Sequence, residues 1–103
     1  MIGATVKEAG KRMNAGKTPL SNIMYVPTAM KGLADAMQYG AIKYGSPPGD
    51  KGWLQHAPEE TLQSLMRHLS AHMNGEIHDP ESGLPHMACV LFNVAAYMEQ
   101  CAI

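Results

Sequence analysis

Two histidines and a glutamate are spaced so that they would lie on one side of a helix. His68, His72 and Glu76 follow one another at intervals of four residues, which places them within an arc of about 80° on a helix. Neutral imidazole and carboxylate are good ligands for divalent transition metals, and histidines four residues apart can bind one ion together. The alternative is structural, with histidines at the border of a buried stripe that fill space and bond to carbonyl groups. The spacing alone leaves both interpretations open.

A second set of polar residues marks the last helix that the sequence predicts. His86, Asn93, Tyr97 and Gln100 form a sparse stripe on a segment that is otherwise apolar almost all round. Buried polar groups without partners are costly, so this stripe must find partners on the neighbouring helix or in something bound between the two helices. A structural network of these side chains is one interpretation. A ligand or metal site between the helices is the hypothesis that we favour.

The connection between the two segments adds acidic groups. Asp79 and Glu81 lie there together with Ser82, and their oxygens can serve either as metal ligands or as helix caps. Arg67 is a cation beside His68, and Lys43 is a second cation near an apparent turn. Cations next to acids and histidines are typical of a polyphosphate site, in which a metal bridges some oxygens and Lys or Arg holds the rest.

A single tryptophan, Trp53, follows a Pro-Pro-Gly-Asp turn. It is either a lid over the core or a stacking surface for a ligand, and the sequence does not favour one over the other. The chain contains neither a Walker-type glycine loop nor a G-x-G-x-x-G motif. Kinase and dinucleotide-binding functions are therefore excluded.

Three helices must position these residues. Apolar side chains recur with helical periodicity over 27–45, 58–74 and 85–100, and Pro and Gly residues punctuate their ends. The intervening segments 46–57 and 76–84 are predicted as loops. The fold class that follows is all-α: a small bundle of about three main helices.

The last predicted helix also bears on assembly. A helix that is apolar on every side is normally buried, and three helices in so short a chain hardly cover one. We therefore expect a homo-oligomer, a dimer or higher. We divide the chain into an N-terminal arm over residues 1–26 and a helical domain over residues 27–103.

Length and composition limit the remaining possibilities. A chain of 103 residues, 46% hydrophobic and 17% charged, is a single folded domain and not a disordered segment. Its net charge of −1 argues against nucleic-acid binding. It has no apolar run near the ~20 residues of a membrane span and no signal-peptide pattern. With two cysteines and no disulfide framework, the expected location is the cytoplasm, with no membrane partner.

The order of four segments resembles a known family. GAIKYG (40–45), a Trp at position 53, RHLSAHMNGE (67–76) and DPESGLPHMACVLFN (79–93) together resemble the phage dATP/dGTP diphosphohydrolases, which are MazG-like members of the all-α NTP pyrophosphohydrolases. The resemblance extends over about residues 16–99. It implies hydrolysis of a deoxynucleoside triphosphate, dGTP or dATP, to the monophosphate and pyrophosphate. It also implies a divalent metal, a helical oligomer and, for a viral protein, the host cytoplasm.

The resemblance also suggests roles for individual residues. The polar positions that match are Lys43, Arg67, His68, His72, Glu76, Asp79, Glu81, Ser82, His86 and Asn93. As metal ligands we predict His68, His72, Glu76 and His86. For catalysis, as a further ligand or the general base, we predict Glu76, Asp79 and Glu81. For binding of the nucleotide ligand we predict Lys43, Tyr44, Trp53, Arg67, Ser82 and Asn93, with Trp53 or Tyr44 stacking on the base.

One departure from the wider group affects the metal. That group carries E-x-x-E on one helix and E-x-x-D on the next as a magnesium site. Here Gln63 breaks the first half, and Gly75 puts Glu76-x-x-Asp79 at a helix end. A metal must then rely on histidine, which favours Co²⁺, Mn²⁺ or Zn²⁺ over Mg²⁺. The departure leaves two alternatives: a viral protein that binds and sequesters a nucleotide or nucleotide signal without cleaving it, and a helical interaction domain with structural histidines.

Overall fold

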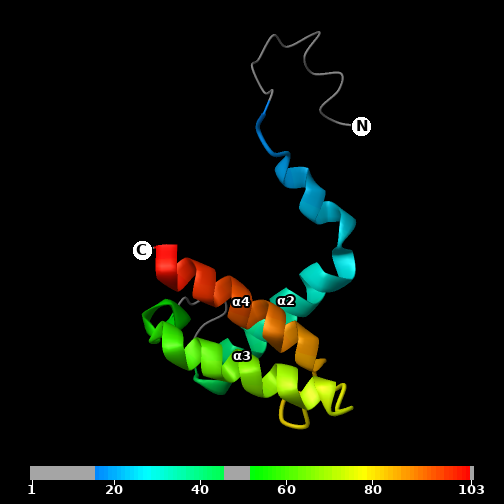
Figure 1. The fold of residues 1–103 in the computed structure, drawn as a ribbon, viewed down its shortest axis with the longest axis vertical. Coiled ribbons are helices and arrows are strands. Elements are labelled where there is room, and N and C mark those ends of the chain that lie inside the picture. The colour runs from blue at the N-terminus through cyan, green and yellow to red at the C-terminus, as the bar shows by residue number, and fades with distance from the viewer. Residues whose placement is uncertain (1–15, 46–51, 103) are drawn as a thin grey trace.

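The computed structural model describes residues 16–45 and 52–102, and within them the chain is built from helices. The α-helices are α2 (Pro27–Lys43), α3 (Pro58–Met73) and α4 (His86–Ala102), and two short 3₁₀ helices are η1 (Leu20–Tyr25) and η2 (Gly52–Gln55). Figure 1 shows α3 and α4 lying side by side, with α2 crossing next to them. The predicted all-α fold with three main helices is confirmed. In the described part of the chain, the extended pairing is limited to one isolated bridge between His78 and Pro85.

Proline residues begin two of the helices, and a glycine ends one of them. α2 and α3 each have proline in the first turn, where its missing N–H costs nothing. Gly75, with a φ of 96°, ends α3, and the N–H of Glu76 donates to the Ala71 carbonyl at 3.0 Å. This is the usual glycine-dependent termination of a helix. It places Glu76 and Asp79 after the helix, as the sequence predicted.

The segment that precedes α2 extends away from the bundle. Figure 1 shows η1 projecting from the end of α2, and its contacts are with α2 alone among the helices. The structure describes this part of the predicted arm from residue 16 onward. Residues 1–15 of the arm, residues 46–51 of the predicted loop and residue 103 lie outside the described residues, and the proposed domain boundary stays a prediction.

The buried core is small. Among the described residues, its apolar members are Ala36, Ala88 and Ala96, and no large side chain is fully buried. Large apolar side chains remain exposed on several elements, including Met87, Val94 and Met98 on α4. None of the described helices is long and apolar enough to span a lipid bilayer.

The close approach of α2 and α4 depends on a glycine. A Cβ built at Gly32 would meet the Cβ of Ala88 at 3.2 Å, whereas one built at Gly40 would meet nothing within 4 Å. The close approach of the two helices therefore lies at Gly32 and not at Gly40.

Replacing Gly32 with valine is therefore expected to destabilise the chain. The added methyl groups must push α2 away from α4, at a cost of about 1–3 kcal/mol, measurable as a lower urea midpoint. Gly40→Ala is the matched control, and it should gain up to about 1 kcal/mol from helix propensity. A Gly32→Val chain as stable as the wild type would contradict this account of the packing.

Candidate functional site

A cleft of about 580 Å³ lies among α2, α3, α4 and the connection after α3. This volume is in the range of small-molecule sites. We expected a site between the two helices over 58–74 and 85–100, and the cleft does lie between them, but α2 forms a third wall. The predicted residues that line it are Lys43, Tyr44, Trp53, Arg67, His68, Asp79, Glu81, Ser82 and Asn93.

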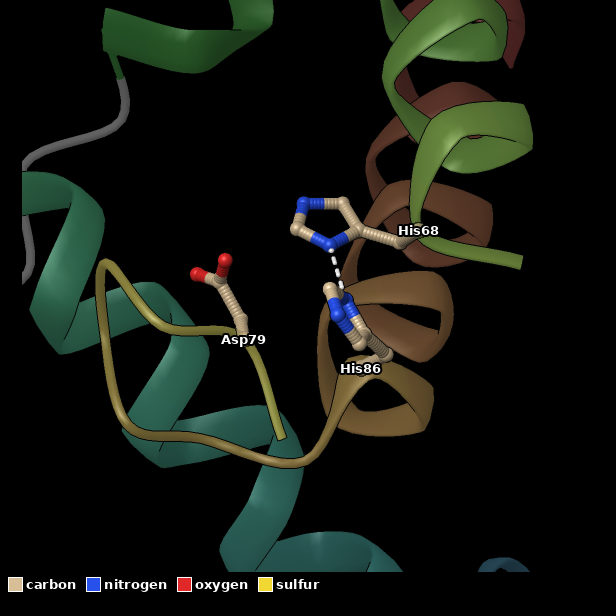
Figure 2. Close-up of side chains that lie close together, drawn as sticks. All are labelled: His68, Asp79 and His86. Carbon is tan, nitrogen blue, oxygen red and sulfur yellow. Dashed lines mark hydrogen bonds between the residues drawn. The ribbon is translucent and has the colours of Figure 1, made fainter. Parts of the chain in front are cut away.

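Three side chains from three different elements converge beside this cleft. His68 comes from α3, Asp79 from the connection and His86 from the first turn of α4, as Figure 2 shows. Each offers one ligand atom such that all three atoms lie within 4.8 Å of one another. Two imidazoles and a carboxylate form a donor set that suits Zn²⁺, Co²⁺ or Mn²⁺. These residues, which we call the His–Asp cluster, fit a divalent transition metal on their chemistry and spacing.

Glu76 orients the buried histidine of the cluster. His86 is only 4% exposed, and its Nε2 lies 2.8 Å from the Glu76 carboxylate. An ionised carboxylate only accepts, so Nε2 carries the hydrogen, and in the neutral ring Nδ1 keeps a lone pair. A carboxylate behind a histidine is a common second-sphere arrangement in metal sites, because it fixes the ring and its tautomer.

The two histidines contact each other directly. Their Nδ1 atoms are 2.8 Å apart, joined by the dashed line in Figure 2. Because Nδ1 of His86 keeps the lone pair, Nδ1 of His68 donates in this contact, which leaves its Nε2 free to accept. Burial lowers the pKa of His68, and the nearby negative charge of Asp79 offsets only part of this shift. His68 is therefore neutral at neutral pH, the form that binds metals.

Asp79 is held by its own loop. Its Oδ2 accepts hydrogen bonds from the Ser82 hydroxyl at 2.7 Å and the Ser82 N–H at 3.1 Å. Burial raises the pKa of Asp79, but the hydrogen bonds from Ser82 and from the Glu81 N–H outweigh it and leave the pKa below its usual value. The sequence left open whether Asp79 and Ser82 cap or ligate. Asp79 caps its own turn through these bonds, and its carboxylate also belongs to the His–Asp cluster, so its role as a ligand stays a prediction.

A lysine and a tyrosine of α2 contact the same loop. Lys43 Nζ lies 2.7 Å from Glu81 Oε2, and the Tyr39 hydroxyl donates to that oxygen at 2.8 Å. The hydrogen bonds from Lys43 and Tyr39 lower the pKa of Glu81, and the same contact with Glu81 raises that of Lys43. Glu81 therefore keeps Lys43 at the edge of the cleft. Tyr44 is 69% exposed and lies under the Lys43 ammonium.

Arg67 lines the cleft without an ion-pair partner among the described residues. It is exposed and precedes His68 on α3. Its guanidinium is free to meet a phosphate in a bidentate manner.

The other end of the cleft is apolar and aromatic. Trp53 packs edge-on against Phe92, with ring centroids 5.6 Å apart. Its main-chain carbonyl accepts from Gln100 Nε2 at 2.8 Å, and Gln100 Oε1 accepts from the buried Thr61 hydroxyl at 2.9 Å. These bonds hold Trp53 over the α3–α4 groove. Both roles considered for Trp53, lid and stacking surface, are compatible with this position.

Some predicted residues lie apart from the His–Asp cluster. His72, one turn after His68, is not among the grouped ligand atoms, and its Nδ1 is buried without a hydrogen-bond partner in the described part of the chain. Glu76 contacts the cluster through His86 rather than joining it. The roles proposed for these two residues stay predictions.

Several cleft residues were not singled out from the sequence. They are Tyr39, which is one turn before Lys43, and Thr61 and Ser64, which precede His68 by two turns and one turn. Helical spacing from the predicted site residues was the available signal.

These observations define a small all-α domain with a His–Asp cluster at one end of a cleft and two cations at its edge. The family model described as dATP/dGTP diphosphohydrolase, N-terminal, matches residues 7–103, so the chain belongs to this family. The family's description names a diphosphohydrolase and, within it, the N-terminal domain. Neither the curated proteins nor the solved structures contain a match to the chain.

Proposed function

We propose that the cleft binds dATP or dGTP together with a divalent metal ion and hydrolyses the nucleotide to its monophosphate and pyrophosphate. The observation that carries this proposal is the grouping of His68, Asp79 and His86 within 4.8 Å beside a cleft that Lys43 and Arg67 also line. The description of the family, which names dATP and dGTP, supports this substrate class. The reaction would draw on the nucleotides of the cytoplasm, in line with the predicted location.

The reaction is a displacement at the α-phosphorus. The oxygen of a water molecule forms the new bond to this phosphorus, the bond to the oxygen bridging the α- and β-phosphates breaks, and pyrophosphate leaves. A bound divalent metal would supply Lewis acidity, which lowers the pKa of water and offsets phosphate charge. Arg67 and Lys43 would hold the remaining phosphate oxygens.

The attacking water must also lose a proton. Glu76, Asp79 and Glu81 remain the candidates to accept it. Hydrogen bonds leave the pKa of Asp79 and Glu81 below their usual values, so either carboxylate is a weak base. The proposal therefore relies on acidification of the water more than on a strong protein base.

The test is release of pyrophosphate from dATP and dGTP, followed with each of Co²⁺, Mn²⁺, Zn²⁺ and Mg²⁺ and with chelator. We expect turnover with a transition metal and none with chelator. Absence of pyrophosphate with every metal, from a folded chain, would rule out the hydrolase.

A second candidate function is binding of a nucleotide without cleavage. The observation that favours it is the donor set, because the His–Asp cluster contains one carboxylate where the wider group has an all-acidic site. Calorimetric binding of dATP or dGTP without pyrophosphate release would support this alternative.

We also propose that the chain assembles as a homo-oligomer through the uncovered side of α4. Met87, Val94 and Met98 are 44%, 40% and 64% exposed and recur at helical spacing along one face. A second copy that covers this face would extend a core whose buried apolar residues, in the described part of the chain, are all alanines.

Val94→Glu is expected to dissociate such an assembly, because it places a charge in the centre of the apolar face. Light scattering after size exclusion should show a dimer or larger species for the wild type and a monomer for the variant. Gln63→Glu, on the exposed side of α3, is the control and should leave the mass unchanged. A monomeric wild type would contradict the proposal.

A further inference from the structure

Asn93 offers the cleft a carbonyl oxygen and not an amino group. Its Nδ2 lies 3.2 Å from Ser64 Oγ and 3.0 Å from the main-chain oxygen of Cys89, and an amide nitrogen has two hydrogens to donate. The Cys89 carbonyl can only accept. Turning the amide over would therefore bring two acceptors together, which fixes the orientation of Asn93.

The carbonyl oxygen of Asn93 is accessible. No described residue donates a hydrogen bond to it. If it were buried, it would be a buried polar atom without a partner, but among the described residues the one such side-chain atom is His72 Nδ1. Oδ1 of Asn93 is therefore not buried. Because Asn93 lines the cleft and the described residues leave its Oδ1 unpaired, this oxygen is available to a ligand in the cleft.

This acceptor lies at a suitable distance from the His–Asp cluster. Asn93 follows His86 by two turns of α4, or about 10 Å along the helix axis. That separation is comparable to the reach of an extended nucleotide from its α-phosphate to the far edge of its base. Ser64, which holds the amide, is one turn from His68 on α3, and the Trp53–Phe92 pair forms the adjacent apolar wall.

We propose that Asn93 Oδ1 reads the base by accepting a hydrogen bond from an exocyclic amino group of a purine. The inference rests on the proposed function for its substrate class, since dATP and dGTP both carry such a group. Adenine has it at position 6 and guanine at position 2, so the two bases must sit differently to reach the same oxygen. Ser64 is a positioning residue, because it acts by holding the amide.

Paired nucleotides that differ only in the amino group test this role. The pairs are dATP against 2′-deoxypurine riboside triphosphate and dGTP against dITP, with kcat/KM and calorimetric affinity measured for each. We expect the analogue without the amino group to be about 10-fold weaker in at least one pair, because the acceptor is left unpaired. Equal values in both pairs would overturn the proposal.

Variants connect the discrimination to this residue. Asn93→Leu, of similar volume, should lower the affinity for the amino-bearing nucleotide and bring both members of the pair to the same value. Ser64→Ala should reduce the discrimination while keeping the oxygen. The control is Asn74→Leu, since Asn74 lies at the exposed end of α3, and it should keep the wild-type ratio.

Discrimination that persists in Asn93→Leu would assign the reading of the base to another group and overturn the proposal. If Asn93→Leu does not fold, the paired nucleotides measured on the wild type and on Ser64→Ala still test whether Asn93 recognises the amino group. Affinity is measured separately from turnover, so loss of hydrolysis alone would reject the proposed reaction and leave the test of Asn93 intact.

Discussion

Replacing His86 with glutamine is expected to lower metal-dependent pyrophosphate release by at least about 100-fold. His86 is buried, it contacts His68, and Glu76 fixes its ring. Glutamine keeps a polar side chain of similar length but loses the imidazole lone pair that a metal requires. The measurement is the initial rate with saturating Co²⁺ or Mn²⁺, together with the affinity for the metal alone.

The control for this prediction is His78→Gln. His78 is exposed and is not part of the His–Asp cluster, so both rate and metal affinity should stay at the wild-type level. Because His86 is buried, its loss could unfold the chain, and the half-buried His68→Gln serves as a second variant with the same expected loss. Full activity in a folded His68→Gln or His86→Gln chain would contradict the proposed metal site.

Replacing Arg67 with glutamine is expected to lower kcat/KM for dATP and dGTP by about 10- to 100-fold, as loss of one or two charge-assisted hydrogen bonds would. Arg67 lines the cleft and has no ion-pair partner in the described part of the chain. Its guanidinium is therefore available to bind the phosphates. Folding should be unaffected, because the side chain is exposed.

Lys31→Gln is the matched control, because Lys31 is an exposed cation that pairs with Asp35 and does not line the cleft. It should leave kcat/KM unchanged. Arg67→Lys separates charge from geometry: partial recovery is expected, since lysine supplies the charge but not the planar fork. If Arg67→Gln and Lys31→Gln behave alike, Arg67 does not bind the phosphates.

Local patterns in the sequence were enough to predict the helices. Proline starts and glycine stops placed α2 and α3 within two residues of their observed bounds, because these signals act through neighbouring backbone groups. The close contact of Gly32 with Ala88 was not visible, since it depends on which face of α2 meets α4. That choice is made by packing between segments far apart in the chain.

The three members of the His–Asp cluster were all named from the sequence, and their roles stay predictions, but helical spacing alone did not bring them together. Helical spacing suggested His68 with His72, whereas the structure groups His68 with His86 and Asp79. Asp79 reaches them because the turn after α3, closed by Gly83 at a φ of 76° and by the bonds of Ser82, folds back toward α4. A loop conformation of this kind is not encoded in periodicity. Neither is the third wall of the cleft, which α2 provides.

The most direct test is an anomalous diffraction map of crystals grown with Co²⁺ and a dATP analogue that has a nitrogen bridge between the α- and β-phosphates. We expect one Co²⁺ peak bonded to His68, Asp79 and His86 at about 2.0–2.2 Å, with the phosphates beside it and Arg67 on their oxygens. A peak held by other residues, with the analogue bound away from these three side chains, would contradict the account.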